Sequence, residues 1–275
     1  MSVCASYPQP TILGSSTPRC WRFFVGMGRA CLAAMCICVL FILAQTGLSA
    51  TDEALAAAPS TKSRPKPKQA RTKIDSYTIA QRGDHYRVNI TYPQLGIPAA
   101  DAEISIWARE QATTFIESVQ QIPRPMPMPY ELTITYETIT PSRHATSVVF
   151  TISTFMSEVH PEPGLATFVY ARPDGVRLTY GDLFLRMDGI LESFSSLCRA
   201  SLTEKLGNGL DRKMLELGTK PRMSNFDLFA LTDTGVRIFF PPYQVAPLKD
   251  GYLHVDIPLT NLMDYKPRMR FWGKR

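Results

Sequence analysis

The chain has 275 residues, of which 45% are hydrophobic and 20% charged, a length that allows one or two domains with an ordinary buried core. Its net charge of +6 conceals an uneven distribution. Fourteen of the 30 basic residues lie in the first 50 residues, at 62–73 or at 266–275, which leaves 16 basic and 22 acidic residues in 74–265, a net charge of −6. This excludes a strongly basic domain. The basic ends favour anionic surfaces such as lipid headgroups or wall polymers, or are solvated linkers.

An apolar segment near the N-terminus is typical of a secretory signal. Ala30–Ala44 contains fifteen apolar residues without a charge, follows Arg29, and precedes small and polar residues up to Ala50. We therefore expect residues 1–50 to be a signal peptide, with Met27 as an alternative start. A membrane-spanning helix usually needs about 20 apolar residues, so an uncleaved membrane anchor is the alternative. Both imply export to the periplasm or the extracellular space, which argues against nucleic acid as a partner.

The next segment predicts a tether. Residues 51–73 are rich in Ala, Pro and Lys and are expected to be extended and disordered. Five of the six cysteines lie in the leader, so the processed chain retains only Cys198 and forms no intramolecular disulfide. The folded part, expected from Ile74, therefore depends on an ordinary core.

The first half of the folded region predicts a hairpin, a helix and three strands. Alternating β-branched and aromatic residues predict strands at Tyr77–Ile79 and Tyr86–Tyr92. Apolar residues at helical spacing predict a helix with Asp101 as N-cap that ends near Val119. After a Pro-Met segment, alternation predicts the strands Glu131–Thr140, Thr146–Phe155 and Ala166–Ala171.

The second half predicts two helices and three strands. A helix over about Gly189–Leu206 carries Cys198 on its apolar face, so this thiol is expected to pack in the core. A short helix is expected at Asp211–Leu217. The last strands are Phe226–Leu231, Val236–Phe240 and Tyr252–Ile257. Two main amphipathic helices among hairpin-linked strands favour a single α+β domain with an antiparallel sheet over 74–265, followed by a basic tail at 266–275.

The sequence offers one cluster with catalytic potential. The four histidines show no metal-type spacing, and no nucleophile elbow, phosphate loop or dinucleotide fingerprint follows the leader. His160 lies between Glu158 and Glu162, a set able to hold a metal or to act as acid and base. Alternatively, His160 hydrogen-bonds a loop carbonyl and fixes the turn before Pro161. We expect no catalytic residue, metal or cofactor; an envelope hydrolase or metal-dependent enzyme centred on His160 is the alternative.

The segment Phe239–Pro247 predicts an exposed loop. Because proline cannot donate to a sheet ladder, Pro241 and Pro242 must leave the sheet or line its edge. Tyr243 and Gln244 are then presented on a rigid loop, where exposed side chains often contact ligands. Anchoring of Tyr243 on the core is the equal alternative. The candidate ligand-binding residues are Tyr243, Gln244 and His160.

Several blocks in a fixed order resemble a known exported module. The blocks are Ile90–Gln94 before a helix, Val159-His160-Pro161, Leu178–Phe184, Phe226–Leu231, Gly235–Phe240 and Pro242–Pro247. They resemble the extracellular part of RsiV-type anti-sigma factors, which also occurs ahead of the deacetylase domain in PdaC-type peptidoglycan deacetylases. The resemblance covers Ile74–Tyr265. One departure is that the family's Gly-Gly-Ala before His-Pro is Ser157-Glu158-Val159 here.

This resemblance implies a binding role. In RsiV-type proteins the module is a receptor for lysozyme, and in the deacetylases it is expected to assist at the cell wall. The expectation is therefore a non-catalytic, exported binding or sensor module of the cell envelope. Its partner would be a wall glycan or an envelope protein such as a lysozyme, whose positive charge suits the acidic folded part. Contact with the membrane surface would come through the basic ends or an uncleaved leader.

Overall fold

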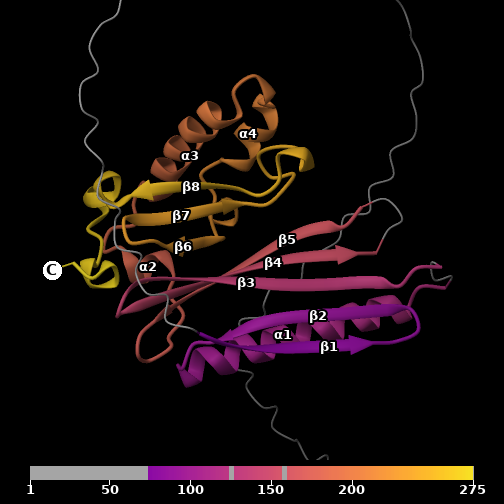
Figure 1. Ribbon diagram of the computed structural model, residues 1–275. Helices are drawn as coiled ribbons and strands as arrows, with labels where there is room; N and C mark the ends of the chain where they lie inside the picture. Colours follow the sequence, from indigo (N-terminus) through magenta and orange to yellow (C-terminus); the bar gives the residue numbers. More distant parts are fainter. Residues whose placement is uncertain (1–73, 124–126, 157–159, 275) are drawn as a thin grey trace, which may run out of the picture. The chain divides into compact units, whose positions relative to one another are not determined.

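The computed structural model describes residues 74–123, 127–156 and 160–274 (Figure 1). The expected signal peptide (1–50) and tether (51–73) lie outside these ranges. Within them, no helix is both long enough and apolar enough to cross a membrane.

The strands form two sheets, one with five strands in the order β1-β2-β3-β4-β5 and one with three in the order β6-β7-β8 (Figure 1). The strands are β1 Asp75–Arg82, β2 Tyr86–Gln94, β3 Tyr130–Ser142, β4 Ala145–Phe155, β5 Glu162–Ala171, β6 Phe229–Leu231, β7 Gly235–Phe240 and β8 Leu253–Pro258. The α-helices are α1 Pro98–Gln120, α2 Tyr180–Leu183, α3 Ile190–Leu206 and α4 Arg212–Gly218. The 3-10 helices are η1 Gly207–Gly209, η2 Met223–Asn225, η3 Leu248–Asp250, η4 Leu259–Tyr265 and η5 Met269–Trp272.

The α+β class is confirmed, but the sheet arrangement differs from the expected single antiparallel sheet. Pairing within each sheet is antiparallel except between β2 and β3, which run parallel. The helix α1 connects these two strands, and parallel neighbours require such a crossover. The second sheet begins at β6. In the chain, α2, α3 and α4 separate β6 from β5, the last strand of the first sheet.

The first core lies between α1 and the larger sheet. The predicted apolar stripe is confirmed, since Ile104, Ala108, Phe115 and Val119 are all buried. Asp101, however, is not the N-cap. The helix begins at Pro98, and proline suits this position because it needs no N–H and has a preset φ. The Asp101 carboxylate instead accepts hydrogen bonds from the backbone N–H groups of Leu95, at 2.6 Å, and Ile97, at 3.0 Å.

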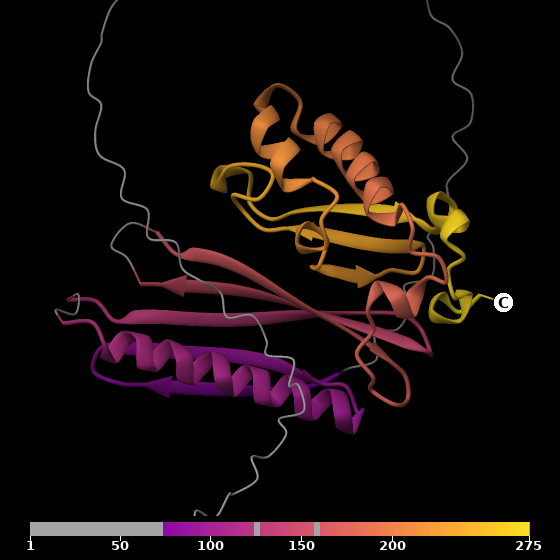
Figure 2. The same ribbon diagram turned by 180° about the vertical axis from the view of Figure 1, so that it is seen from behind.

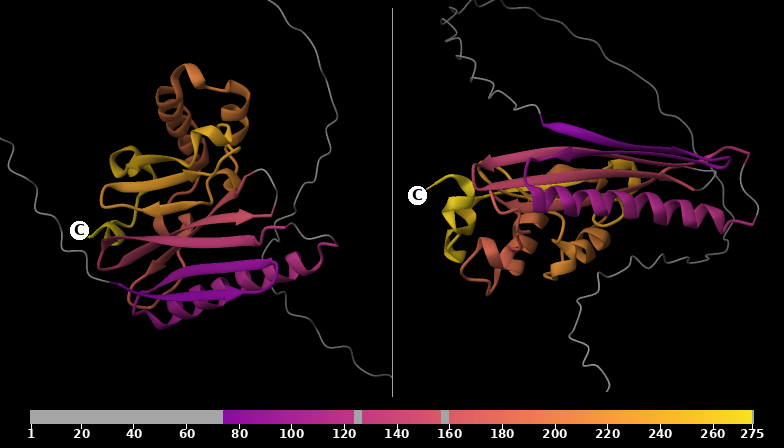
Figure 3. Two further views of the ribbon diagram at one scale, coloured as in Figure 1. Left: turned by 45° about the vertical axis from the view of Figure 1, so that its right-hand side comes forward. Right: turned by 90° about the horizontal axis from the view of Figure 1, so that it is seen from below.

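The second core lies between α3 and the smaller sheet. As expected, Cys198 is buried there beside other apolar side chains, and burial raises the pKa of its thiol to about 12. Such a thiol is a packing group rather than a nucleophile. Figures 2 and 3 show that α1 and α3 lie on the same side of the strands, which leaves the opposite side without an α-helix. We call the former the helix side and the latter the helix-free side.

The expected basic tail at 266–275 packs against the second core. Phe271 and Trp272 in η5 are buried, and the Trp272 indole Nε1 donates a hydrogen bond to the carbonyl oxygen of Gly235 at 2.9 Å. The ordered region therefore continues past Tyr265. The net charge of the segment did not indicate this packing, because a charge count takes no account of the large apolar surface that two aromatic side chains bury.

Replacing the anchoring tryptophan tests this boundary. Trp272→Ala is expected to lower the free energy of unfolding by about 3–5 kcal/mol, since it removes a buried aromatic side chain and leaves a cavity. Lys274→Ala, an exposed change two residues away, is the control and is expected to stay within about 0.5 kcal/mol. Urea denaturation followed by circular dichroism measures both. Equal stability of the two variants would contradict a structural role for the tail.

Candidate functional site

His160 lies on the exposed approach to β5. Its Nδ1 is 3.2 Å from the carbonyl oxygen of Pro161, which makes the ring nitrogen the donor. This geometry matches the turn-fixing alternative. Glu158, its expected acidic neighbour, lies outside the described residues. Within the described ranges, no group of three His, Cys, Asp or Glu side chains is placed to hold a metal ion.

Tyr243 stands at the tip of the β7–β8 loop and is 56% exposed. Its φ of 71° is unusual for a residue other than glycine, and its backbone N–H donates to the carbonyl oxygen of Ala246 at 2.9 Å. The exposed ring therefore contradicts the alternative of an anchor on the core. Val245 and Ala246, which are buried, anchor the loop instead. A ligand-binding role for Tyr243 stays a prediction.

Gln244 has a structural position. Its Nε2 donates to the carbonyl oxygens of Gly218, at 3.1 Å, and Asn225, at 2.9 Å. Both amide protons are thus committed to the end of α4 and to η2. A Cβ at Gly218 would overlap the backbone carbonyl of Gln244, so the two segments are in direct contact. The contact geometry gives Gln244 a role in holding this loop, and its ligand-binding role stays a prediction.

The two neighbouring residues are expected to respond differently to substitution. Gln244→Ala leaves two backbone carbonyls without donors and is expected to cost about 1–3 kcal/mol of stability. Tyr243→Ala removes an exposed ring and is expected to stay within about 0.5 kcal/mol. Thermal and urea unfolding compare the variants. A larger cost for Tyr243→Ala would show that the ring, and not the amide, holds the loop.

The helix-free side of the larger sheet presents hydroxyl and amide groups. One row across the strands runs Ala80, Asn89, Thr133, Ser153, Pro163. A neighbouring row contains the pairs Thr78–Thr91 and Thr135–Thr151. None of these side chains is buried. We call the polar members of the two rows the hydroxyl face: Thr78, Asn89, Thr91, Thr133, Thr135, Thr151 and Ser153.

The smaller sheet borders this face with an aromatic ring. Tyr252, 37% exposed, donates its hydroxyl to the carbonyl oxygens of Ile152, at 3.1 Å, and Gly164, at 3.3 Å. These carbonyls belong to a β4–β5 pair next to Ser153 and Thr151. The ring is therefore fixed at the margin of the hydroxyl face while part of its surface stays open.

Charged and aromatic residues continue from Tyr252 along the smaller sheet. Arg237 on β7 and Asp256 on β8 are opposite each other and form a bidentate ion pair at 2.7 and 2.9 Å. The Arg237 hydrogen bonds hold the pKa of the Asp256 carboxyl below its ordinary value. The next pair is Phe239 and His254, whose ring centroids are 6.1 Å apart.

His254 is held in its neutral form. Burial, and then the positive charges of Arg237 and Lys205, lower its pKa below the ordinary 6.5, against smaller opposing effects of Asp256 and Glu137. A group whose pKa is depressed by folding contributes stability that is fully present above its unfolded-state pKa. That contribution is lost as the pH falls from about 6.5 through the lower folded-state value.

This histidine predicts a pH-dependent stability. As the pH falls below about 6.5, the free energy of unfolding of the protein should fall, because His254 gains a proton in the unfolded state first. His254→Gln should flatten that part of the curve. Denaturation at each pH, with His85→Gln as the control for an exposed ring, measures the difference. Parallel curves for the protein and His254→Gln would contradict it.

The fold is similar to that of known structures. Two solved structures of DUF3298 family proteins share it: one from Pseudomonas aeruginosa PAO1 (15% identity, TM-score 0.53, 74% of this chain and 98% of that one) and one from Bacteroides fragilis (12% identity, TM-score 0.50, 74% and 96%). These likenesses concern the fold alone. In sequence, residues 181–260 match the model of the family described as a protein of unknown function, DUF3298. The match covers α3, α4 and the second sheet.

A curated relative adds the link to peptidoglycan. Over 181 residues the chain is 22% identical to peptidoglycan-N-acetylmuramic acid deacetylase PdaC of Bacillus subtilis strain 168. The match includes 66% of this chain but only 38% of the length of PdaC. The resemblance to the module shared with PdaC-type proteins is thus confirmed, and it connects the chain with peptidoglycan-related proteins of the cell envelope.

Sequence reasoning missed Tyr252 and the hydroxyl face. Alternation within 252–257 places Tyr252, His254 and Asp256 on one face, and that signal was available. The threonines gave a weaker signal, since threonine is common in any strand. Their assembly into rows depends on strand register, which the sequence pattern leaves open.

Proposed function

We propose that this protein is a non-catalytic binding module of the cell envelope and that it recognises wall glycan through the hydroxyl face. The observation that carries the proposal is the chemistry of this face: exposed or half-buried, uncharged hydrogen-bonding side chains in neighbouring rows of one sheet, bordered by the Arg87–Glu131 ion pair and with no α-helix over them. The similarity to PdaC, whose name specifies a peptidoglycan substrate, supports the same class of ligand.

Hydroxyl and amide side chains suit a glycan because each both donates and accepts hydrogen bonds, as sugar hydroxyls do. Adjacent strands are about 4.8 Å apart, so the rows present such groups at regular intervals. Tyr252 adds the open surface of an aromatic ring at the margin. Aromatic surface and hydrogen-bonding groups side by side can engage the apolar and polar faces of a sugar ring together.

A binding role is favoured over an enzyme centred on His160. The described contact of this ring is with the Pro161 carbonyl, and neither Tyr243 nor the hydroxyl face lies in the same segment. A protein ligand such as a lysozyme is the other partner that the resemblance implies. Binding of a lysozyme would depend on charge rather than on the hydroxyl rows. Substitutions in the hydroxyl face should therefore affect binding of glycan and of lysozyme differently.

Binding to N-acetylglucosamine oligomers, the neutral sugar component of the wall glycan, tests the proposal. Saturable binding is expected, and Thr133→Val with Thr135→Val should weaken it about tenfold, since two hydrogen-bonding groups worth about 0.5–1.5 kcal/mol each are lost. Valine keeps the β-branched shape of threonine, so the sheet should remain intact. Thr113→Val with Thr114→Val, at two exposed threonines of α1, is the matched control.

The outcomes separate the alternatives. Unchanged glycan binding in the double variant would exclude the hydroxyl face. Binding of lysozyme without binding of glycan would replace the glycan by a protein ligand. Turnover of peptidoglycan that His160→Ala abolishes would overturn the non-catalytic role.

A further inference from the structure

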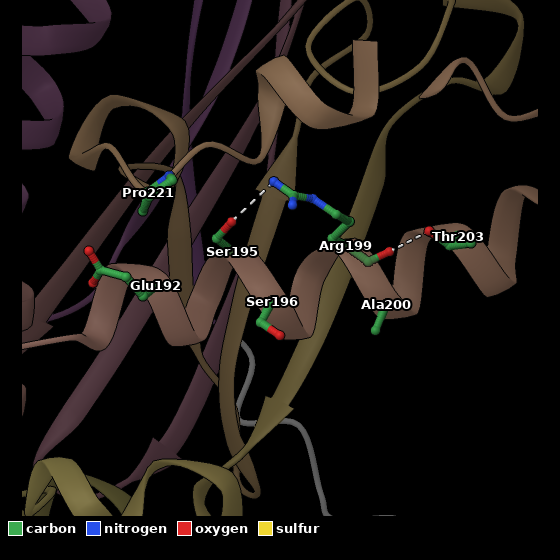
Figure 4. Close-up of a pocket in the computed structure, with 7 residues that line it drawn as sticks. All are labelled: Glu192, Ser195, Ser196, Arg199, Ala200, Thr203 and Pro221. Atoms are coloured by element: carbon green, nitrogen blue, oxygen red, sulfur yellow. Dashed lines mark hydrogen bonds between the residues drawn. The ribbon is translucent and has the colours of Figure 1, made fainter. Parts of the chain in front are cut away.

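A cavity of about 630 Å³ opens on the outer surface of α3 (Figure 4). Six of its lining residues lie on successive turns of this helix, and Pro221, after α4, lies above them (Figure 4). The helix α3 itself lies on the helix side (Figure 2), and the hydroxyl face is on the other side of the strands. The lining residues are Glu192, Ser195, Ser196, Arg199, Ala200, Thr203 and Pro221.

The guanidinium of Arg199 is fixed in place by two buried hydroxyls. Its Nε donates to Thr219 Oγ1 at 3.1 Å, and one terminal nitrogen lies 3.4 Å from Ser195 Oγ (Figure 4). The Thr219 hydroxyl donates its own proton to the carbonyl oxygen of Leu215, at 2.7 Å, so its oxygen can accept the hydrogen bond from Arg199. The side chain is thus oriented before any ligand arrives.

These partners are neutral, and the cation is half-buried. The ion pairs found among the described residues are Arg87–Glu131, Arg177–Glu103 and Arg237–Asp256, so Arg199 is in none of them. A guanidinium has five N–H donors, and the two contacts above use two of them. A partly desolvated cation with free donors is best satisfied by an anion, which forms short, charge-assisted hydrogen bonds.

We infer that this cavity is a subsite for a carboxylate, with Arg199 as the residue that binds it. A monoanion is favoured over phosphate because Glu192 lines the same cavity and repels a dianion more strongly. Ser196 also lines the cavity, with its hydroxyl pointing away from the guanidinium (Figure 4). Lys220 and Arg222 flank Pro221 in the chain and add two positive charges to the segment that carries it.

If the protein binds the cell wall, as proposed above, wall peptides are the source of the carboxylate. Only this choice of source rests on the proposed function. A short peptide ending in a free carboxylate would enter from the open side of the cavity. The neutral N-acetylglucosamine oligomers that test the hydroxyl face offer Arg199 no carboxylate, so the two sites can fail separately.

Titration of the purified protein with acetyl-dialanine tests the subsite. The arginine Nε–Hε resonances are followed by NMR, and that of Arg199 is assigned by its loss in Arg199→Gln. A saturable shift of this resonance is expected with the free acid. The C-terminal amide of the same compound is expected to give no shift, and inorganic phosphate a weaker one. An equal response to acid and amide, or tighter binding of phosphate, would overturn the carboxylate assignment.

Two substitutions with opposite expected effects keep the test decisive. Arg199→Gln should weaken binding of acetyl-dialanine at least tenfold, while Glu192→Gln should strengthen it several-fold by removing the repelling charge. Arg109→Gln, at an exposed position of α1, alters the net charge equally and should leave binding unchanged. If Arg199→Gln fails to fold, unchanged or weaker binding in Glu192→Gln still overturns the proposal.

The two proposals are told apart by measuring both ligands on each variant. Retained glycan binding in Arg199→Gln together with lost binding of acetyl-dialanine is the expected pattern. Binding of glycan without any response to acetyl-dialanine removes the subsite and leaves the proposed function standing. The reverse result removes the hydroxyl face and leaves the subsite.

Discussion

The arrangement of this domain depends on how the free edge of β6 is satisfied. The backbone N–H groups of Phe229 and Leu231 point away from β7, and each donates to a buried side-chain hydroxyl of the larger sheet, that of Thr167 at 3.1 Å and that of Ser147 at 2.9 Å. An edge strand buried without such partners would lose about 1–3 kcal/mol for each orphaned N–H. The two hydroxyls therefore replace the missing neighbouring strand and fix where the second sheet meets the first.

That junction determines which surfaces remain open. Ala230, between the two capped residues, packs against Val149 and Leu165 on the face of the larger sheet opposite α1. Only one end of this face is covered in that way, so the rows of threonine and asparagine beyond it stay exposed. The same packing brings Tyr252 onto the carbonyls of β4 and β5. The hydroxyl face and its aromatic margin are thus products of one sheet-to-sheet contact.

Periodicity made the elements predictable and left their pairing undetermined. The stripe of α1 and the burial of Cys198 followed from helical spacing, because side chains three and four residues apart share a face. No local sequence pattern indicates that β2 and β3 are parallel neighbours. Nor does one indicate that Trp272 bonds to Gly235, 37 residues away in the chain. The same limit applied to the site. Gln244 was correctly placed in an ordered loop, but its partners Gly218 and Asn225 come from a different part of the chain.

The two proposed sites have opposite chemistry and opposite locations. The hydroxyl face is uncharged and lies on the helix-free side, whereas Arg199 provides a fixed positive charge on the helix side. Sites that share no residue usually act additively. A wall polymer carries neutral sugars and carboxylate-bearing peptides in the same material. A module with one site for each would gain effective concentration at the second site after binding the first, so two weak contacts on opposite sides could hold it firmly within the wall.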